Sequence, residues 1–502
     1  MFESAELGHK IDKSTWGKTV PKLREALLDA QADVREAAKF PVILLVGGVD
    51  GAGKGETVNL LNEWLDPRHV MTHATGPSGD EVEGYRPPMA RFWRALPPKG
   101  QIGIFFGSWY TEPIVARVYA RTKRAAFDES LEQTLRFERM LVDEGALIVK
   151  LWLHLSKAAQ KKLFETLESD PNTAWRVTKN DWKNVKRYDA FRSISERALR
   201  QTSTAEAPWI IVEGADARYR TLTVGNVLLK AIRERLDRDA AEPAASRAAA
   251  PKAGREALVV SPRVDKLDIL RSLDLTKKIA KPKYEKELLA LQARLNQLSR
   301  HPGGGKHGVA LVFEGNDAAG KGGAIRRITG ALDARTYHII PIAAPTEEER
   351  AQPYLWRFWR HVPRRGRFAI FDRSWYGRVL VERVEGFARP DDWMRAYTEI
   401  NDFEAQLAAD GTIVVKFWLA VSQEEQLRRF KEREKTGFKR FKITDEDWRN
   451  RKKWGDYEVA VCDMIDRTST EEAPWTLVPA NDKYYARVMA LRTVCDRLEK
   501  AL

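Results

Sequence analysis

The sequence predicts an α/β protein of two tandem domains, each built on a mostly parallel sheet flanked by helices. Three observations support this prediction. The chain has 502 residues, more than one ordinary hydrophobic core accommodates. Its two halves repeat the same short motifs in the same order. Each half also places a glycine-rich loop between an apolar strand and a helix.

The repeat keeps a nearly constant register along the chain. The loop lysines Lys54 and Lys321 are 321 − 54 = 267 residues apart, and the motif "RFWR" recurs from Arg91 to Arg357, 357 − 91 = 266 residues later. "SWY", "VKLWL"/"VKFWL" and "TSTAEAPW"/"TSTEEAPW" follow at the same offset. So many ordered matches indicate a gene-internal duplication, and the period is too long for a solenoid.

The segment between the two copies is rich in Ala, Pro and charged residues and lacks apolar periodicity. We interpret 237–257 as a linker. The predicted domains are therefore an N-terminal domain at 1–236 and a C-terminal domain at 258–502, with a lid at about 422–455 in the second.

Both copies contain the same order of elements. A helical stretch (22–38; 284–299) leads into a buried strand, the glycine-rich loop and a helix. Three more apolar strands follow, and the third strand precedes a charged helical segment. The expected strands are 42–46, 102–106, 146–153 and 209–212 in the first copy and 309–313, 368–371, 412–419 and 475–478 in the second. A phosphate loop after the first strand makes these P-loop kinase-like domains.

The loop of the second copy reads "GNDAAGKGG". Its spacing Gly315-x-x-x-x-Gly320-Lys321 favours phosphate binding over a plain glycine-rich turn, because backbone N–H groups and a helix N-terminus point at an anion. Gly322 stands where a Ser or Thr hydroxyl normally contacts Mg²⁺. We expect Lys321 to be catalytic. The expected phosphate-holding residues are Gly315, Asn316, Ala318, Ala319, Gly320 and Gly322.

Two carboxylates are candidates to replace the missing hydroxyl. Asp317 lies inside the loop, and Asp372 ends the strand "RFAIF". Mg²⁺ prefers oxygen ligands and keeps several waters, so this pair is expected to hold it, with Mn²⁺ as a substitute. The alternatives are a turn-forming role for Asp317 and a helix N-cap for Asp372.

Basic residues surround these acids. Arg373 and Arg378 flank "SWYG", where guanidinium groups would stabilise the charge of a phosphoryl group in transfer. The later segment "LRRFKEREKTGFKRF" is predicted to be a mobile cationic lid. The alternative interpretation of that segment is a solvated helix face. Its basic residues are Arg428, Arg429, Lys431, Arg433, Lys435, Lys439 and Arg440.

The first copy lacks most of these groups. Asp372 corresponds to Phe106, Arg373 to Gly107, and Arg378 to Glu112. A phenyl ring cannot coordinate Mg²⁺, and a carboxylate repels phosphate. The lid loses its charge as well: Arg429, Lys431, Arg433, Lys435, Lys439 and Arg440 correspond to Leu163, Glu165, Leu167, Ser169, Thr173 and Ala174, and only Lys162 keeps the charge of Arg428. We therefore expect the second copy to carry the chemistry.

The chain resembles the polyphosphate kinase 2 family at these residues. The matching segments are "GNDAAGKGG", "WRFWRHVP", "FDRSWYGRVLVERV", "VVKFWLAVSQEEQLRRF" and "TSTEEAPWTLVPANDKYYAR". They span the second copy, and in weaker form the first. Because nucleic-acid P-loop enzymes do not share this combination, the resemblance is specific.

The resemblance implies Mg²⁺-dependent phosphoryl transfer between inorganic polyphosphate and a nucleotide on a P-loop fold with a helical lid. It implies functional roles for Asp317, Lys321, Asp372 and Arg373, and for the lid arginines Arg428 and Arg433. The tandem arrangement resembles the two-domain members, which phosphorylate AMP to ADP with their C-terminal half. The expected partners are thus polyphosphate and AMP or ADP.

Other functions remain open at this stage. A nucleoside diphosphate kinase using polyphosphate, an ATP-dependent small-molecule kinase, and an inactive assembly protein share parts of the pattern. The net charge of +14 also fits a nucleic-acid-binding protein, but that leaves Lys321 and Asp372 without a role, so we expect no nucleic acid partner. A homo-oligomer is compatible with the fusion but not required by it. Two cysteines, no signal-peptide core and no membrane-length apolar run lead us to expect a cytoplasmic protein without membrane contact.

Overall fold

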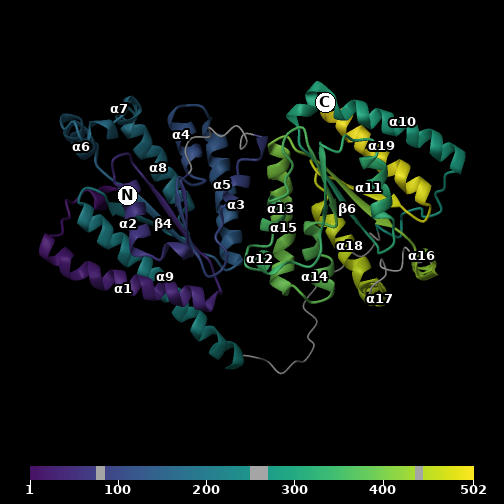
Figure 1. Cartoon of the computed structure of the whole chain (residues 1–502), viewed down its shortest axis with the longest axis horizontal. Coiled ribbons are helices and arrows are strands. Elements are labelled where there is room, and N and C mark those ends of the chain that lie inside the picture. The colour runs from purple at the N-terminus through teal and green to yellow at the C-terminus, as the bar shows by residue number, and fades with distance from the viewer. Residues whose placement is uncertain (75–84, 249–268, 436–444) are drawn as a thin grey trace. The chain divides into compact units, whose positions relative to one another are not determined.

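The structure is a computed structural model that describes residues 1–74, 85–248, 269–435 and 445–502 (Figure 1). The chain forms two compact units. The first comprises Met1–Gly79, Arg91–Glu256 and Thr346–Trp356, and the second comprises Asp80–Ala90, Ala257–Pro345 and Arg357–Leu502. No helix in the described ranges is long and apolar enough to cross a bilayer.

Each unit contains a five-stranded sheet in which every pairing of neighbouring strands is parallel. The strand orders are β2-β3-β1-β4-β5 and β7-β8-β6-β9-β10, which are equivalent under the repeat. The predicted pair of parallel α/β domains is confirmed. The strands are β1 Val42–Gly48, β2 Val70–Ala74, β3 Ile102–Phe106, β4 Leu147–His154, β5 Trp209–Glu213, β6 Val309–Gly315, β7 Tyr337–Pro341, β8 Phe368–Asp372, β9 Ile413–Ala420 and β10 Trp475–Pro479.

The edge strands β2 and β7 were missing from the sequence-based prediction. Each pairs along one side only, β2 with β3 and β7 with β8. Their side chains are mostly half-buried or exposed, unlike the central strands, whose residues are nearly all buried. A half-exposed edge strand needs no continuous apolar run, so its sequence lacks the signal that identified the other strands.

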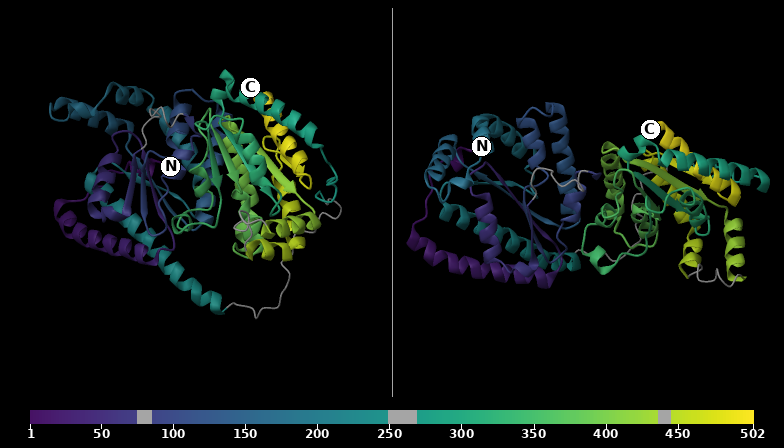
Figure 2. Two further views of the ribbon diagram at one scale, coloured as in Figure 1. Left: turned by 45° about the vertical axis from the view of Figure 1, so that its right-hand side comes forward. Right: turned by 45° about the horizontal axis from the view of Figure 1, so that its top comes forward.

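Helices cover both faces of each sheet. In the second unit α10, α11 and α19 lie on one side and α15 and α18 on the other (Figures 1 and 2). Apart from short 3₁₀ turns, the helices before the linker are α1 Lys13–Ala37, α2 Lys54–Trp64, α3 Ala90–Arg94, α4 Thr111–Val118, α5 Arg124–Asp143, α6 Lys157–Ser169, α7 Lys179–Lys186, α8 Tyr188–Thr202 and α9 Ala217–Ala248. Those after it are α10 Lys281–Ser299, α11 Lys321–Thr329, α12 Glu347–Arg350, α13 Trp356–Trp359, α14 Val381–Val384, α15 Pro390–Ala409, α16 Gln423–Lys435, α17 Asp445–Lys452, α18 Trp454–Thr468 and α19 Lys483–Ala501.

The predicted linker begins inside a helix. Helix α9 continues from Ala217 to Ala248, so 237–248 is helical and only 249–257 of the predicted linker lies outside the described residues. Ala is the most frequent residue in 237–248 and the strongest helix former. The absence of apolar periodicity was therefore no sign of irregular structure in this stretch.

The repeated "SWY" motif belongs to the core of each unit. In the second unit Trp375 Nε1 and Tyr376 Oη donate to the buried carboxylate of Glu404 at 2.9 and 2.7 Å, and Lys416 Nζ donates to the same group at 2.6 Å. Trp109, Tyr110, Glu138 and Lys150 make the same contacts in the first unit. A buried ion pair with all its hydrogen bonds satisfied orients the chain at the end of β3 and β8.

Candidate active site

The loop between β6 and α11 depends on unusual backbone conformations. Gly315 has φ +149°, and a Cβ there would lie 2.5 Å from the carbonyl oxygen of Leu419, so only glycine lets β6 approach β9 this closely. Gly320 has φ +112° and precedes the first residue of α11, Lys321. The sequence thus forms the predicted strand–loop–helix, with the helix N-terminus directed at the loop.

Lys321 and Gly322 stand at the start of α11, beside the loop. Lys321 Nζ donates to the carbonyl oxygen of Gly315 at 2.9 Å, which holds the ammonium group beside the loop. A Cβ built on Gly322 would meet no atom within 4 Å, so this position opens on space at the start of α11. An unobstructed helix N-terminus beside an ammonium group is a favourable place for phosphate.

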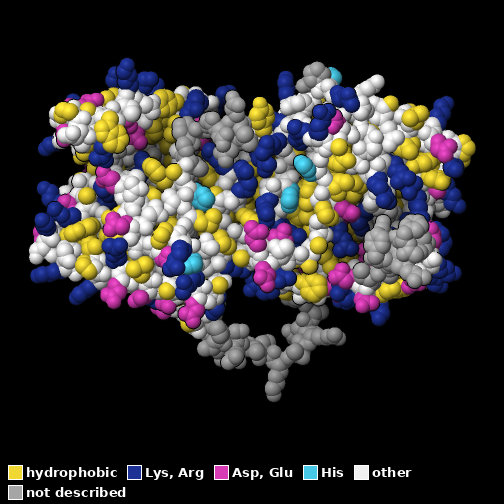
Figure 3. Space-filling view, viewed as in Figure 1, with side chains coloured by type: hydrophobic (Ala, Val, Ile, Leu, Met, Phe, Trp, Pro, Cys, Tyr) yellow, Lys and Arg dark blue, Asp and Glu magenta, His cyan; other side chains and the backbone are white. Residues whose placement is uncertain are grey.

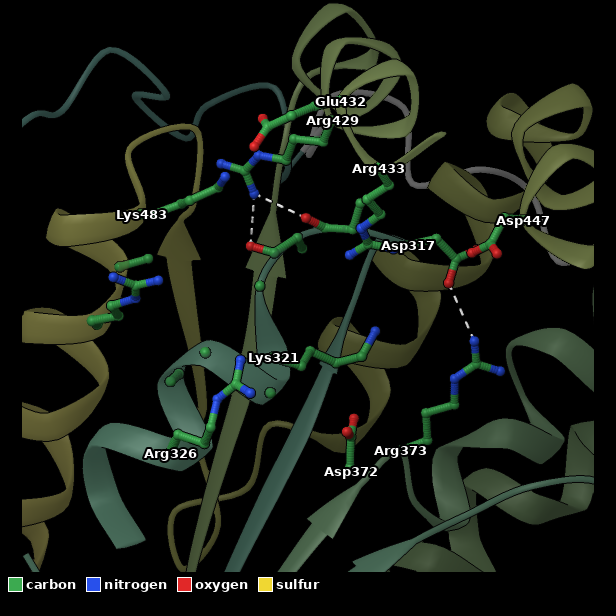
Figure 4. A pocket seen from close by; sticks show the side chains of 18 residues that line it. Asp317, Lys321, Arg326, Asp372, Arg373, Arg429, Glu432, Arg433, Asp447 and Lys483 are labelled. Atoms are coloured by element: carbon green, nitrogen blue, oxygen red, sulfur yellow. Dashed lines mark hydrogen bonds and ion pairs between the residues drawn. The ribbon is translucent and has the colours of Figure 1, made fainter. Parts of the chain in front are cut away.

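A cavity of about 460 Å³ lies over this loop (Figure 4). Its charged lining is mixed but basic on balance. The basic residues of the lining are Lys321, Arg326, Arg373, Arg429, Arg433, Lys483 and Arg487. The acidic residues are Asp317, Asp372, Glu432 and Asp447. Elsewhere Lys and Arg are spread among acidic side chains on the face shown in Figure 3. The basic cavity therefore suits a polyanionic ligand that brings its own charge.

Both predicted metal-binding acids line the cavity. Asp317 Oδ1 lies 3.2 Å from Arg373 Nη2, and its Oδ2 accepts a hydrogen bond from Asn450 Nδ2 at 2.9 Å. Asp372 is the last residue of β8, and its register partner on the neighbouring strand β6 is Phe313, two residues before the loop. In the described ranges no group of three or more His, Cys, Asp or Glu is placed to hold a metal. Two carboxylates suit Mg²⁺ when water and phosphate oxygens supply the other ligands.

Arg373 has a left-handed backbone with φ +66°, uncommon for a residue with a side chain. Such a conformation costs on the order of 1–3 kcal/mol and is concentrated at functional sites. Arg373 also lines a second, smaller cavity of about 80 Å³, which shares Asp317 with the first and includes Glu314 and Trp418. Arg373 and Asp317 therefore stand where the two cavities meet.

Of the two lid arginines predicted to act in the site, Arg433 lines the cavity and Arg428 does not. Arg428 is exposed and pairs with Glu425 and Glu432, and it does not line the cavity. Its neighbour Arg429 is buried and, like Arg433, lines the cavity. Residues four apart share one face of a helix, whereas adjacent residues are turned by about 100°. Sequence spacing could not tell which face of α16 is turned to the loop.

Arg429 holds the phosphate loop in place. Its Nη1 donates to the carbonyl oxygens of Ala318 and Ala319, both at 2.9 Å, and its Nη2 donates to those of Ala480 and Asn481 at 2.7 and 2.9 Å. Its Nε donates to Glu425 at 2.6 Å. A guanidinium group committed to these acceptors orients the loop and has little capacity left for a ligand.

Arg378 also departs from the prediction. It belongs to the short 3₁₀ helix Trp375–Arg378 and forms an ion pair with Glu382 at 2.9 Å, outside the residues that line the cavity. Trp375 and Tyr376 are anchored in the core, so the chain turns away from the cavity after Arg373. Of the two arginines flanking "SWYG", only Arg373 reaches the loop.

Three basic residues of the cavity were not singled out from the sequence. Arg326 comes from α11, and Lys483 and Arg487 come from the first turns of α19. Burial, together with the charge of Arg429, lowers the pKa of Lys483 from its usual value. The available signal for Lys483 and Arg487 was their spacing of four at the start of a helix. Their counterparts Ala217 and Thr221 are uncharged, although Arg218 and Arg220 stand beside them in the first copy.

A buried carboxylate at the end of β6 was also missed. Glu314 accepts a hydrogen bond from Ser374 Oγ at 2.8 Å, and burial raises its pKa although Lys321 and Arg373 act in the opposite direction.

The predicted lid contains α16 and α17, while Lys439 and Arg440 lie outside the described residues.

The first unit keeps the loop but surrounds it with different side chains. Lys54 Nζ donates to Gly48 at 2.7 Å, as Lys321 does to Gly315. Arg220, however, lies so close that a Cβ on Gly53 would be 2.1 Å from its guanidinium carbon. Arg220 and Arg176 donate to Glu56 at 2.7 and 2.6 Å, in the first turn of α2. An internal ion cluster thus lies beside Gly53, whereas the position of Gly55, the counterpart of Gly322, is open in this unit too.

Comparison with known proteins agrees with this geometry. The polyphosphate kinase 2 (PPK2) family model matches residues 10–240 and again 278–502. The chain belongs to the polyphosphate kinase 2 family. It is 58% identical to the polyphosphate:AMP phosphotransferase of Pseudomonas aeruginosa, over 100% of this chain and 99% of that protein. It is 55% identical to the protein of the same name in Pseudomonas syringae pv. tomato, with the same coverage. A crystal structure of a polyphosphate kinase 2 from Pseudomonas aeruginosa PA01 superposes with a TM-score of 0.88 at 55% identity, covering 100% and 99% of the two chains.

Proposed function

We propose that the second unit transfers the terminal phosphoryl group of inorganic polyphosphate to AMP and so forms ADP. The observation that carries this proposal is the basic cavity over the loop, where Lys321, Asp372 and Arg373 converge at an open helix N-terminus. Two curated relatives that match the whole chain bear the name polyphosphate:AMP phosphotransferase, which supports AMP as the acceptor.

The two cavities suggest how the substrates are arranged. The large basic cavity fits a chain of phosphates, whose terminal group would lie at the loop while Arg326, Lys483 and Arg487 contact the following phosphates. The smaller cavity offers Trp418, Leu380 and Val381, an apolar surface, but at about 80 Å³ it has room for only part of a nucleotide. Asp317 and Arg373 line both, so the transferring group would pass between them at this point.

The transfer needs positioning and charge neutralisation more than proton chemistry. The bond between the terminal phosphorus and its bridging oxygen breaks, and a bond forms between that phosphorus and an oxygen of the AMP phosphate. The shortened polyphosphate keeps the bridging oxygen. The attacking oxygen is already anionic, so no general base is required.

The residues of the site take separate roles in this step. Lys321 and the loop N–H groups bind the oxygens of the terminal phosphate, and Arg373 stabilises the charge that spreads over its equatorial oxygens. Asp317 and Asp372 would hold Mg²⁺, which supplies positive charge opposite the phosphate oxygens. Arg429 acts as a positioning residue through its bonds to the loop carbonyls.

The test is one assay of the full chain with Mg²⁺ and long-chain polyphosphate, offering AMP, ADP, GMP and GDP in parallel. ADP formed mainly from AMP is the expected result. ATP formed from ADP, with AMP inert, would reassign the protein to the nucleoside diphosphate level. Turnover with ATP and a hydroxyl acceptor, but none with polyphosphate, would instead identify an ATP-dependent kinase. No product from any of these combinations would overturn a kinase function altogether.

A further inference from the structure

Asp317, one of the two acids proposed to hold Mg²⁺, is bound by a side chain from helix α17 of the predicted lid. Asn450 Nδ2 donates to Asp317 Oδ2 at 2.9 Å, although the two residues are 133 positions apart in the chain. Arg373 Nη2 holds the other oxygen, Oδ1, at 3.2 Å. An ionised carboxylate offers about four acceptor sites on its two oxygens. The two donors therefore fix the direction of this carboxylate and still leave lone pairs for a metal ion.

The amide of Asn450 is itself oriented by a neighbouring helix. Its Oδ1 accepts a hydrogen bond from Tyr457 Oη of α18 at 3.1 Å, so its Nδ2 is the end that faces Asp317. Lys453, which directly follows α17, pairs with the buried carboxylate of Glu385 at 3.0 Å and anchors the end of the helix. Asn450 is therefore a donor held in place on both sides, and not a freely rotating surface amide.

A second contact from the same helix supports the backbone of Asp317. Gln426 Nε2 of α16 donates to the Asp317 carbonyl oxygen at 3.2 Å. Arg451 Nη1 of α17 in turn donates to Gln426 Oε1 at 3.0 Å and so orients that amide. Asn450 and Arg451 are adjacent in α17, so this short helix supports both the side chain and the backbone of the acid.

The first unit keeps the direct bond but loses the groups around it. Asn184 Nδ2 donates to Asp50 Oδ2 at 2.7 Å. The groups that surround the same bond in the second unit are replaced: Arg373, Asp372 and Arg451 correspond to Gly107, Phe106 and Val185. Without a second acid, the bond in the first unit attaches its helix α7 to the loop and has no carboxylate pair to arrange. The chain thus contains one bond of each kind, with the same two residue types.

We propose that Asn450 is a positioning residue of the metal site, which holds the Asp317 carboxylate in the direction that binds a divalent cation and so connects α17 to that site. The inference rests on the proposed function in taking Asp317 and Asp372 as the metal-binding pair. A fixed carboxylate binds a cation more tightly because it does not have to be ordered on binding. Loss of a hydrogen-bonding group behind a metal ligand typically weakens metal binding by about 10- to 100-fold.

The experiment measures Mn²⁺ binding to the full chain, without polyphosphate or nucleotide, from the electron paramagnetic resonance signal of free Mn²⁺. Asn450→Leu has a similar size but no amide, and should weaken Mn²⁺ binding by about tenfold. Asn450→Gln keeps the amide and should recover part of that affinity. Tyr457→Phe leaves Asn450 in place but removes the hydroxyl that orients it, and should weaken binding by about two- to threefold.

Asn184→Leu is the matched control, because it removes the same bond from the first unit. It should lower the midpoint of thermal unfolding about as much as Asn450→Leu does, but leave Mn²⁺ affinity unchanged. ADP formation gives a second readout that a merely structural role would not move. Asn450→Leu should raise the Mg²⁺ concentration for half-maximal rate by about tenfold, while kcat at saturating Mg²⁺ falls by less than about threefold.

Three results would each overturn the inference. They are Mn²⁺ binding by wild type that Asp317→Asn leaves unchanged or that is absent altogether, equal Mn²⁺ affinity in wild type and Asn450→Leu, and equal losses of Mn²⁺ affinity in Asn450→Leu and Asn184→Leu. Failure of the proposed function has a different signature. Mn²⁺ binding that depends on Asn450, in a protein that forms no ADP from AMP, would contradict the transfer to AMP and support the role of Asn450.

Discussion

The two units share a backbone but use it differently. Both have the same strand order, the same lysine contact to the loop and the same Asn–Asp bond, Asn184 to Asp50 and Asn450 to Asp317. They differ in the groups around that frame. The second unit surrounds an open helix N-terminus with cations, whereas the first places its own Arg220 against Gly53 and pairs it with Glu56 in the first turn of α2. We therefore expect the first loop to bind phosphate less well than the second, because the side chains around the two loops differ.

The contrast extends to how each loop is held. In the second unit Arg429 from α16 binds the carbonyl oxygens of Ala318, Ala319 and Ala480. In the first unit Arg429 is replaced by Leu163, and Arg220 from α9 donates to Gly214, the counterpart of Ala480, at 2.8 Å. An arginine donates to the turn after the last strand in both units, but it comes from α16 in the second and from α9 in the first. Arg429 also binds the phosphate-loop carbonyls, whereas Arg220 also binds Glu56.

The largest expected effect comes from Asp372. We predict that Asp372→Asn lowers kcat for ADP formation by at least about 10²-fold, because the substitution removes a carboxylate expected to hold the metal. The matched change Phe106→Leu in the first unit should leave the rate unchanged. Steady-state kinetics with polyphosphate and AMP measure both, and equal losses would break the proposed asymmetry.

Arg373→Gly should separate activity from stability. The arginine adopts φ +66°, whereas its counterpart Gly107 adopts φ +81° without strain. We expect kcat to fall by about 10²-fold or more, since the group that stabilises the transferring phosphate is lost. The midpoint of thermal unfolding should stay the same or rise by about 2 °C, because backbone strain is relieved. A parallel fall in Tm and activity would instead indicate a structural role.

Arg429→Leu copies the residue of the first unit and should mainly reduce stability. It leaves the carbonyl oxygens of Ala318, Ala319, Ala480 and Asn481 without this donor, at a cost of about 1–3 kcal/mol for each group that stays buried. Thermal unfolding should show a lower Tm, and polyphosphate KM should rise as the loop loosens.

Adding Ala486→Arg to this variant places an arginine at the position of Arg220. We expect the double variant to recover part of the lost Tm. No recovery would show that the two arginines are not interchangeable, and an unchanged Tm in Arg429→Leu alone would contradict the stabilising role of Arg429. Arg220→Ala is the control in the first unit and should lower stability without slowing ADP formation.

The smallest effect concerns pH. Burial and the nearby Arg429 lower the pKa of Lys483, so its charge is lost at a lower pH than for an ordinary lysine. Polyphosphate binding should therefore weaken by about fivefold as pH rises through that pKa, as expected for one lost charge–phosphate contact. In Lys483→Arg the charge persists and KM for polyphosphate should stay flat over this range. Identical pH profiles for both proteins would remove Lys483 from the binding surface.

Local sequence patterns predicted the central strands and the loop, but they missed the edge strands and the helical start of the linker. The central strands were visible as apolar runs, and the loop was visible from glycine spacing, because both signals are local. The edge strands β2 and β7 were missed because half of their surface is exposed. The helical start of the predicted linker was missed because alanine-rich sequence folds locally without a core to mark it.

The candidate site likewise combines residues that the sequence predicted with one choice that it could not make. Asp317, Lys321, Asp372 and Arg373 are adjacent in sequence to the loop or to the end of its neighbouring strand, and the structure brings them to one cavity. The choice between Arg428 and Arg429 depended on how α16 is rotated against the loop, which no spacing within α16 reveals.

The sequence by itself determined the duplication, the parallel α/β class, the strand–loop–helix and the asymmetry of charge between the copies, since each of these is written in residue types at short range. Only the tertiary structure decided which basic side chains meet the loop and which support it. Lys483 and Arg487 reach the cavity because α19 packs beside α11, and Arg220 lies against Gly53 from the first turns of α9. Long-range packing sets the rotation and approach of helices, and that determines whether the same loop faces open space or its own side chains.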